Sequence, residues 1–99
     1  MSEQQQPPRR GWTVFTEEIP VEVMLDMPPD LAKKVVHFLT ALALEVGGAV
    51  DTDREPPGDP MDDLGVRYSL QVEGEHVLFE YAVIREIREV RVAVLVWFH

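Results

Sequence analysis

The last third of the chain alternates between apolar and polar side chains, and this alternation constrains the fold more than any other feature. In the stretch GVRYSLQVEGEHVLFEYAVI, residues 65–84, every second residue on either side of a turn is large and apolar: Val66, Tyr68, Leu70 and Val72, then Val77, Phe79, Tyr81 and Val83. A period of two is typical of a β-strand with one buried face. The sequence EGE around Gly74 supplies a tight turn. The stretch therefore predicts a β-hairpin.

A further strand follows over residues 90–98. Its alternate residues are apolar in one phase and largely apolar in the other: Val90, Val92, Val94, Val96 and Phe98, against Arg91, Ala93, Leu95 and Trp97. A strand that is apolar on both faces lies centrally in a sheet or is covered by a helix on its second face. We therefore expect this strand to be central or covered by a helix. Its alternate residues Val90, Val92, Val94, Val96 and Phe98 should share one face.

The clearest helix lies between two proline- and glycine-marked boundaries, in PPDLAKKVVHFLTALALEVGG. Its apolar residues recur at spacings of three and four and form one stripe: Leu31, Val35, Phe38, Leu39, Leu42 and Val46. Asp30 is a candidate N-cap, and Gly47 and Gly48 predict the end of the helix. His37 falls off the stripe, so we expect it to face solvent.

The N-terminal part of the chain is less regular. Residues 1–10 are rich in Gln, Pro and Arg and predict a disordered tail, whereas WTVF, residues 12–15, is a plausible strand. Residues 20–27 fit either a strand or one helical face, and Pro20 favours a short helix. The fold expected for residues 11–99 is a single α+β domain. It has two layers, in which a mainly antiparallel sheet of three to four strands packs against one long and one short helix.

Composition narrows the classes of site, location and partner that the chain can have. With 99 residues and no cysteine, the chain has one modest core and no thiolate site or disulfide. No apolar run is long enough to span a membrane, so a cytoplasmic location without membrane partners is expected. The formal net charge of −9 disfavours binding to nucleic acid, because the phosphates would be repelled.

The acidity is concentrated in one segment. Six carboxylates and one arginine lie between residues 47 and 65, within the proline-rich loop DTDREPPGDPMDDLG. Asp59, Asp62 and Asp63 are close in sequence, but their spacing does not match a calcium-binding EF-hand loop. We therefore expect a solvated acidic loop over residues 51–63, with no metal and no cofactor.

Three stretches together resemble the RelE/ParE toxin superfamily. LDMPPDLAKKVVHFLTALA is similar to the family's entry into its long helix, LGVRYSLQVEGEHVLFEYAV to its hairpin, and VRVAVLVWFH to its closing strand. The resemblance covers residues 12 to 99. It implies that the chain is the toxin of a toxin–antitoxin pair. Within this superfamily, the RelE-like branch cleaves mRNA in the ribosome and the ParE-like branch poisons DNA gyrase.

The residues that this resemblance would make catalytic fit the family pattern poorly. The arginine expected after the hairpin turn falls on Val77, or on His76 with a one-residue gap. His99 stands where some relatives have a histidine, and the usual tyrosine near the C-terminus is missing. Arg67, Arg88 and Arg91 are the candidate phosphate partners. His76 is either a general acid or base, or a polar residue just past a turn.

Two functions therefore remain open. In the first, the chain is a divergent RelE/ParE-like protein that binds a protein partner, either an antitoxin-like chain or a second copy of itself, with weak or no catalysis. The exposed apolar surface of the sheet and the acidic loop 51–63 would make the contact and would prefer a basic partner. The alternative is a RelE-like ribosome-dependent mRNA endonuclease in which His76 acts with Arg67 or Arg91, and His99 is a further candidate catalytic residue.

Overall fold

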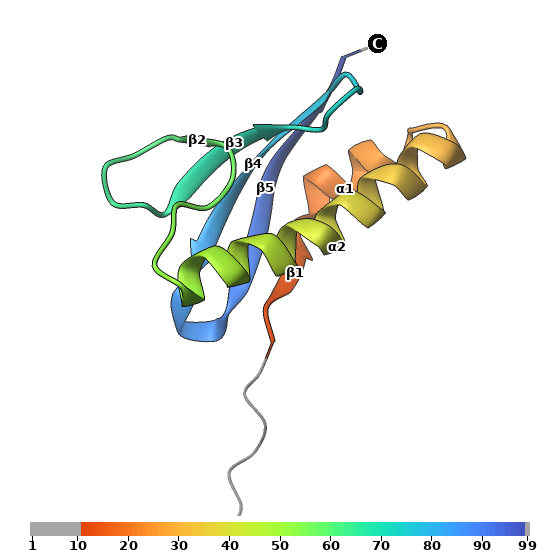
Figure 1. Cartoon of the computed structure of the whole chain (residues 1–99). Helices are drawn as coiled ribbons and strands as arrows, with labels where there is room; N and C mark the ends of the chain where they lie inside the picture. The colour runs from red at the N-terminus through yellow and green to blue at the C-terminus, as the bar shows by residue number, and fades with distance from the viewer. Residues whose placement is uncertain (1–10, 99) are drawn as a thin grey trace, which may run out of the picture.

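A computed structural model describes residues 11–98 and shows an α+β fold (Figure 1). The elements follow one another as β1 (Thr13–Thr16), α1 (Glu18–Leu25), α2 (Pro29–Asp51), β2 (Asp59–Pro60), β3 (Arg67–Gln71), β4 (Val77–Ile84), the 3-10 turn η1 (Arg85–Ile87) and β5 (Glu89–Trp97). The predicted tail, residues 1–10, and His99 lie outside the described residues.

The strands form one sheet in the order β1-β5-β4-β3-β2. The hairpin predicted around Gly74 is confirmed, since β3 and β4 pair antiparallel with Tyr68 opposite Tyr81. The central position of the last strand is also confirmed, because β5 lies between β1 and β4. The expected number of strands was too low. The sheet has five strands because Asp59 and Pro60, within the predicted loop, pair with β3. It is mixed because β1 runs parallel to β5.

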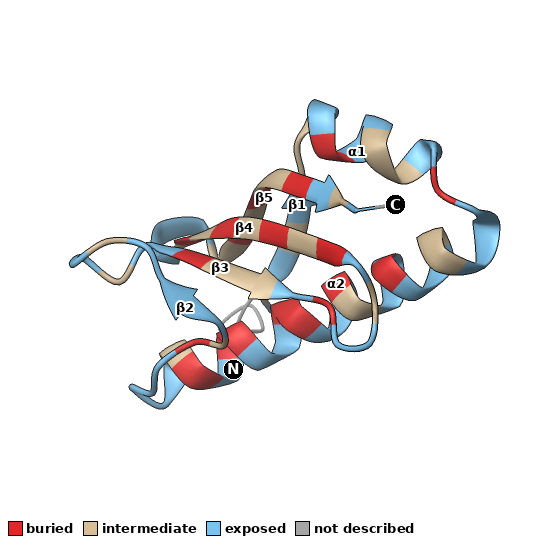
Figure 2. Ribbon diagram, turned by 90° about the horizontal axis from the view of Figure 1, so that it is seen from above, coloured by how far each residue is buried: buried red, intermediate tan, exposed pale blue. Residues whose placement is uncertain are grey.

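One face of the sheet packs on α2, and alternate residues carry the core (Figure 2). Val77, Phe79, Tyr81 and Val83 of β4 are buried, as the alternation predicted. They meet the buried stripe of α2, which contains Val35, Leu39, Leu42 and Val46. The edge of the Phe38 ring contacts Phe79 with ring centroids 5.6 Å apart. His37 is exposed on the outer side of α2, as expected.

Both predicted ends of α2 were wrong. The helix begins at Pro29 with Pro28 at the N-cap position, so Asp30 lies inside the first turn, where its charge favours the helix dipole. At the other end the helix continues through Gly47 and Gly48 to Asp51. Gly47 is not a stop signal, because it serves close packing: a Cβ atom at this position would lie 2.4 Å from Cδ1 of Trp12.

The predicted faces of the last strand were correct only for its first half. Val90 and Val92 are buried, but the register against β4 shifts between Glu80 and Tyr81, so that Ala93 is an extra residue in β5. A bulge of one residue reverses the alternation that follows it. Leu95 and Trp97 therefore join the core face, and Val94, Val96 and Phe98 leave it.

Residues 20–27, for which both a strand and a helix were considered, form most of α1 and the turn after it. Pro20 is buried in the first turn, where its missing N–H group would have no partner within the helix. The N–H group of Glu17 donates to the carbonyl oxygen of Val92 at 3.0 Å. This bond places the start of α1 against β5, and Figures 1 and 2 show α1 beside that strand.

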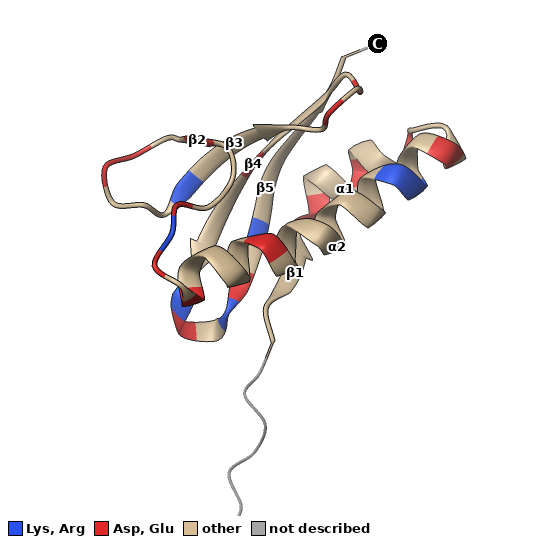
Figure 3. Ribbon diagram, viewed as in Figure 1, with Lys and Arg blue, Asp and Glu red and all other residues tan. Residues whose placement is uncertain are grey.

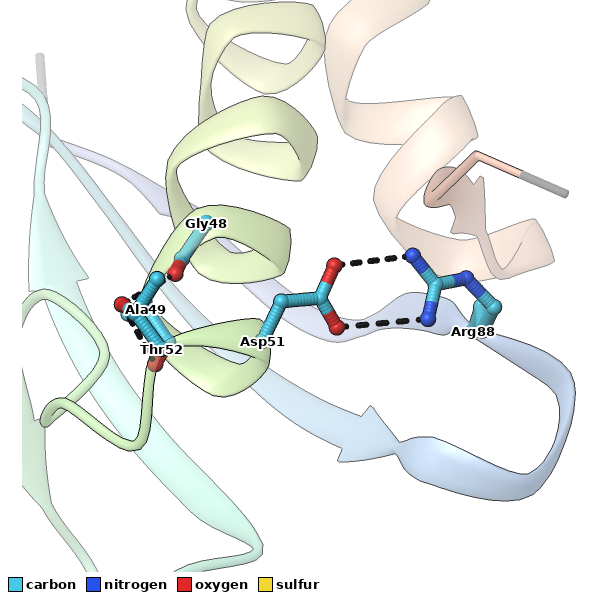
Figure 4. A network of polar contacts seen from close by, with 5 residues as sticks. All are labelled: Gly48, Ala49, Asp51, Thr52 and Arg88. Carbon is cyan, nitrogen blue, oxygen red and sulfur yellow. Dashed lines mark hydrogen bonds and ion pairs between the residues drawn. The ribbon is translucent and has the colours of Figure 1, made fainter. Parts of the chain in front are cut away.

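An ion pair ties the end of α2 to the connection between β4 and β5 (Figure 4). The two terminal nitrogens of Arg88 donate to the two carboxylate oxygens of Asp51 at 3.2 and 2.9 Å. The same guanidinium lies over the ring of Trp12, 5.3 Å from its centroid. The contacts among Arg88, Asp51, Trp12 and Gly47 therefore join the residue before β1, α2 and the turn before β5.

Candidate functional site

Two of the arginines named from the sequence lie in one row on the sheet face opposite α2. Arg67 of β3 and Arg91 of β5 both pair with Ala82 of β4, which lies between them. No helix among the described residues covers this face, and the residues of β4 that point to it are only partly buried. Both arginines were named as candidates from the sequence, which did not predict that they would share a row.

Both arginines are already neutralised by carboxylates. Arg67 lies 3.4 Å from Glu80, and Arg91 lies 2.9 Å from Glu89. The guanidinium of Arg91 also sits over the ring of Phe15, 5.1 Å from its centroid. A phosphate would have to displace these carboxylates, which repel it. The row is therefore better described as a set of paired charges across the strands, with the Phe15 ring at one end, than as a site that binds an anion.

The remaining candidates do not join this row. His76 lies in the turn between β3 and β4 and is exposed, and its carbonyl oxygen accepts a hydrogen bond from the Phe98 N–H group at 2.8 Å. It precedes Ala82 by six residues along an extended strand, so the two are separated by about 20 Å. Arg88 lies in the connection before β5, where it forms an ion pair with Asp51 at the end of α2. His99 falls outside the described residues.

A pair of tyrosines fixes the acidic loop to the sheet. Tyr68 and Tyr81 stack with ring centroids 5.5 Å apart. The hydroxyl of Tyr81 donates to the carbonyl oxygen of Pro57 at 2.5 Å, and that of Tyr68 reaches a Glu55 carboxylate oxygen at 3.4 Å. Burial raises the pKa of Tyr81 above its ordinary value, and burial with the nearby Glu55 charge raises the pKa of Tyr68. Both phenols are therefore neutral hydrogen-bond donors at neutral pH and serve packing.

The acidic loop itself is organised by backbone groups. Asp62 accepts hydrogen bonds from the N–H groups of Leu64 and Val66 at 3.1 and 3.2 Å. The bond from Val66 is the main cause that lowers the pKa of the Asp62 carboxyl group. A carboxylate used in this way stabilises the turn. Within residues 11–98, no group of three or more acidic or histidine side chains is placed to hold a metal ion.

A further hollow lies elsewhere, between α1 and the end of β5. We call this hollow the α1–β5 groove. It has a volume of about 690 Å³ and is lined by Val23, Asp26, Leu95, Val96 and Trp97. Four of these five residues have apolar side chains, and the fifth is the carboxylate Asp26. This groove does not follow from the sequence, because it depends on the bulge that moves Leu95 and Trp97 to the core face.

One signal in the sequence could have indicated it. Residues 11–32 contain five carboxylates and no lysine or arginine. Three of these, Glu18, Glu22 and Asp26, recur every four residues along α1 and share one side of the helix. Acidic residues are visible along α1 in Figure 3. None of the three forms an ion pair with another described residue.

None of the helices in the described part of the chain combines the length and the apolar character that crossing a bilayer requires. The comparisons with known proteins give no further guide: the chain matches no protein-family model, no curated protein and no solved structure.

Proposed function

We propose that the chain is a divergent RelE/ParE-like protein of a toxin–antitoxin type system that acts by binding another protein, with weak or no catalysis. The observation that carries this proposal is the apolar surface left open beside uncompensated carboxylates. Ile19 of α1 exposes 72% of its surface, and Val96 and Phe98 on the strand side expose 38% and 54%. Large apolar side chains gathered around a groove are typical of a protein-binding surface.

The order of elements supports the family part of the proposal. A short strand, a short helix and a long helix precede the loop and the strands β3, β4 and β5, which is the order on which the resemblance rests. The chain departs from the family pattern after the hairpin turn, where His76 and Val77 stand in place of an arginine. Binding needs no such arginine, whereas phosphate cleavage does.

The arrangement of charges favours binding over cleavage. RNA cleavage through the 2′-hydroxyl requires an acid or base and a cation around one phosphate. Here His76 lies about 20 Å from the row that holds Arg67 and Arg91, and both arginines are paired with carboxylates. No contact among residues 11–98 favours the endonuclease alternative.

The experiment is reconstitution of a complex. The tagged chain is expressed in its host, any co-purifying chain is identified and produced separately, and the two purified chains are mixed. Light scattering coupled to size exclusion, at 50 and 500 mM NaCl, should show a complex of fixed stoichiometry that weakens at high salt. A strict monomer that retains no stoichiometric partner under either condition would refute the proposed function.

A further inference from the structure

The α1–β5 groove combines four apolar side chains with a charge pattern that is unfavourable for the free chain. Asp26, at its rim, follows Glu22 by four residues, a spacing at which like charges on a helix repel each other. It also occupies the C-cap of α1, where the helix dipole disfavours a negative charge. A cation brought to this position by another molecule would relieve both interactions.

The apolar surface extends beyond the groove along the same helix. Ile19 precedes Val23 by four residues and Asp26 by seven, so the three share one side of α1. Ile19 is exposed at 72%, and on the strand side Val96 and Phe98 are exposed at 38% and 54%. An occupant of the groove would therefore meet apolar side chains from both walls and carboxylates along one rim.

We propose that the α1–β5 groove docks a segment of another protein in which large apolar side chains are flanked by lysine or arginine. This inference rests on the proposed function, since it names the surface and the chemistry of the partner. The apolar side chains would enter between Val23 and Trp97. The basic side chains would pair with Asp26 and Glu22.

Three other ways of covering this surface fit less well. Residues 1–10 of the chain supply Arg9 and Arg10, but Met1 is their only large apolar residue. A second copy brings a further net charge of −9, and its own acidic α1 would be drawn toward the same surface. An added β-strand also fits poorly, because α1 already lies along the side of β5 that β1 leaves after Thr16.

The test uses three synthetic peptides of 18 residues and the ¹⁵N-labelled full chain. The first peptide is an amphipathic sequence of leucine and lysine, the second replaces lysine by glutamate, and the third replaces leucine by serine. We expect only the first to bind, with amide shifts concentrated in residues 19–26 and 93–98. Its affinity should fall by about tenfold or more between 50 and 300 mM NaCl, as expected for pairing between exposed charges.

Two matched pairs of variants locate the binding. Ile19→Ser and Leu44→Ser each remove an apolar side chain that is 72% exposed, but Leu44 lies on the outer side of α2. Asp26→Asn and Asp63→Asn each remove one exposed carboxylate, from the groove and from the acidic loop. The first variant of each pair should weaken the leucine–lysine peptide by about fivefold or more, and the second should change it by less than about twofold.

Equal losses within either pair would overturn the inference, as would equal binding of the glutamate peptide. Shifts in residues 19–26 that appear on concentrating the chain alone would indicate a second copy as the occupant, and loss of peptide binding only when residues 1–10 are present would indicate the tail. Either outcome overturns the proposal. If the groove fails these tests while the reconstituted complex forms, the proposed function stands and the docking surface is wrong.

Discussion

Substitution of the two adjacent glycines of α2 should have opposite effects on stability. Gly47 and Gly48 both lie inside the helix, where alanine is favoured over glycine by about 1 kcal/mol. At Gly48 the nearest atom to an added Cβ is a terminal nitrogen of Arg54 at 3.9 Å, which is an ordinary contact. Gly48→Ala should therefore stabilise the protein by about 0.5–1 kcal/mol.

At Gly47 the added Cβ would lie 2.4, 2.6 and 3.1 Å from Cδ1, Cγ and Cβ of Trp12. Rotation about the Cα–Cβ bond of Trp12 would move Cγ and Cδ1 out of their packed position and would leave the 3.1 Å contact with Cβ. Forcing one carbon into a packed contact costs about 1–3 kcal/mol, against a helix gain of about 1 kcal/mol. Gly47→Ala should be net destabilising, so the two variants should differ by about 2 kcal/mol.

Urea denaturation followed by circular dichroism at 222 nm measures this difference directly. In thermal unfolding the two midpoints should differ by about 10 °C, given a shift of about 4–8 °C per kcal/mol for a domain of this size. Near-ultraviolet circular dichroism should show a changed tryptophan environment only in Gly47→Ala. If Gly47→Ala is as stable as Gly48→Ala, the contact with Trp12 does not explain why α2 continues through the glycine pair.

Three further predictions concern the contacts around the sheet. Arg88→Lys keeps the charge but loses the two-point pairing with Asp51, so it should cost about 1 kcal/mol in urea denaturation; an unchanged midpoint would contradict the role given to this pair. Tyr81→Phe should cost about 1 kcal/mol, because it leaves a part-buried loop carbonyl without its donor. Since burial raises the pKa of Tyr81, the wild type should lose stability as the pH rises above about 10, and the phenylalanine variant should lose less. The lowered pKa of Asp62 means that its contribution is present above the ordinary carboxyl pKa and is lost as the pH falls through the lower folded value. The Val66 amide resonance should therefore move with that acidic titration, and this movement should be absent in Asp62→Asn.

Much of the fold follows from periodicity that local sequence carries. The hairpin with Tyr68 opposite Tyr81, and the apolar stripe of α2, depend on residues within one element, so the alternation and the three-to-four spacing predict them. The extension of α2 past Gly47 does not follow from local sequence, because Trp12 is remote in the chain. The same holds for the bulge at Ala93, which depends on the pairing of β5 with β4.

Some features of the candidate site can likewise be named from the sequence, and others need the folded structure. Arg67 and Arg91 could be named from the sequence, but their common row requires the register of three strands. Their neutralisation by carboxylates depends on side-chain geometry. The α1–β5 groove could not be predicted, since it needs both the bulge and the position of α1 against β5. Only its charge, the run of carboxylates without a basic residue from residue 11 to residue 32, is visible in the sequence.

The central claim is that the chain works through an apolar, acidic surface and not through the arginines and histidine of its sheet. The most direct measurement is the dissociation constant of the reconstituted complex, by isothermal titration calorimetry, for the wild type, Ile19→Glu and the triple variant His76→Ala, Arg67→Ala and Arg91→Ala. We predict that Ile19→Glu weakens the complex by about tenfold or more and that the triple variant stays within about twofold of the wild type. The reverse ranking would contradict the account.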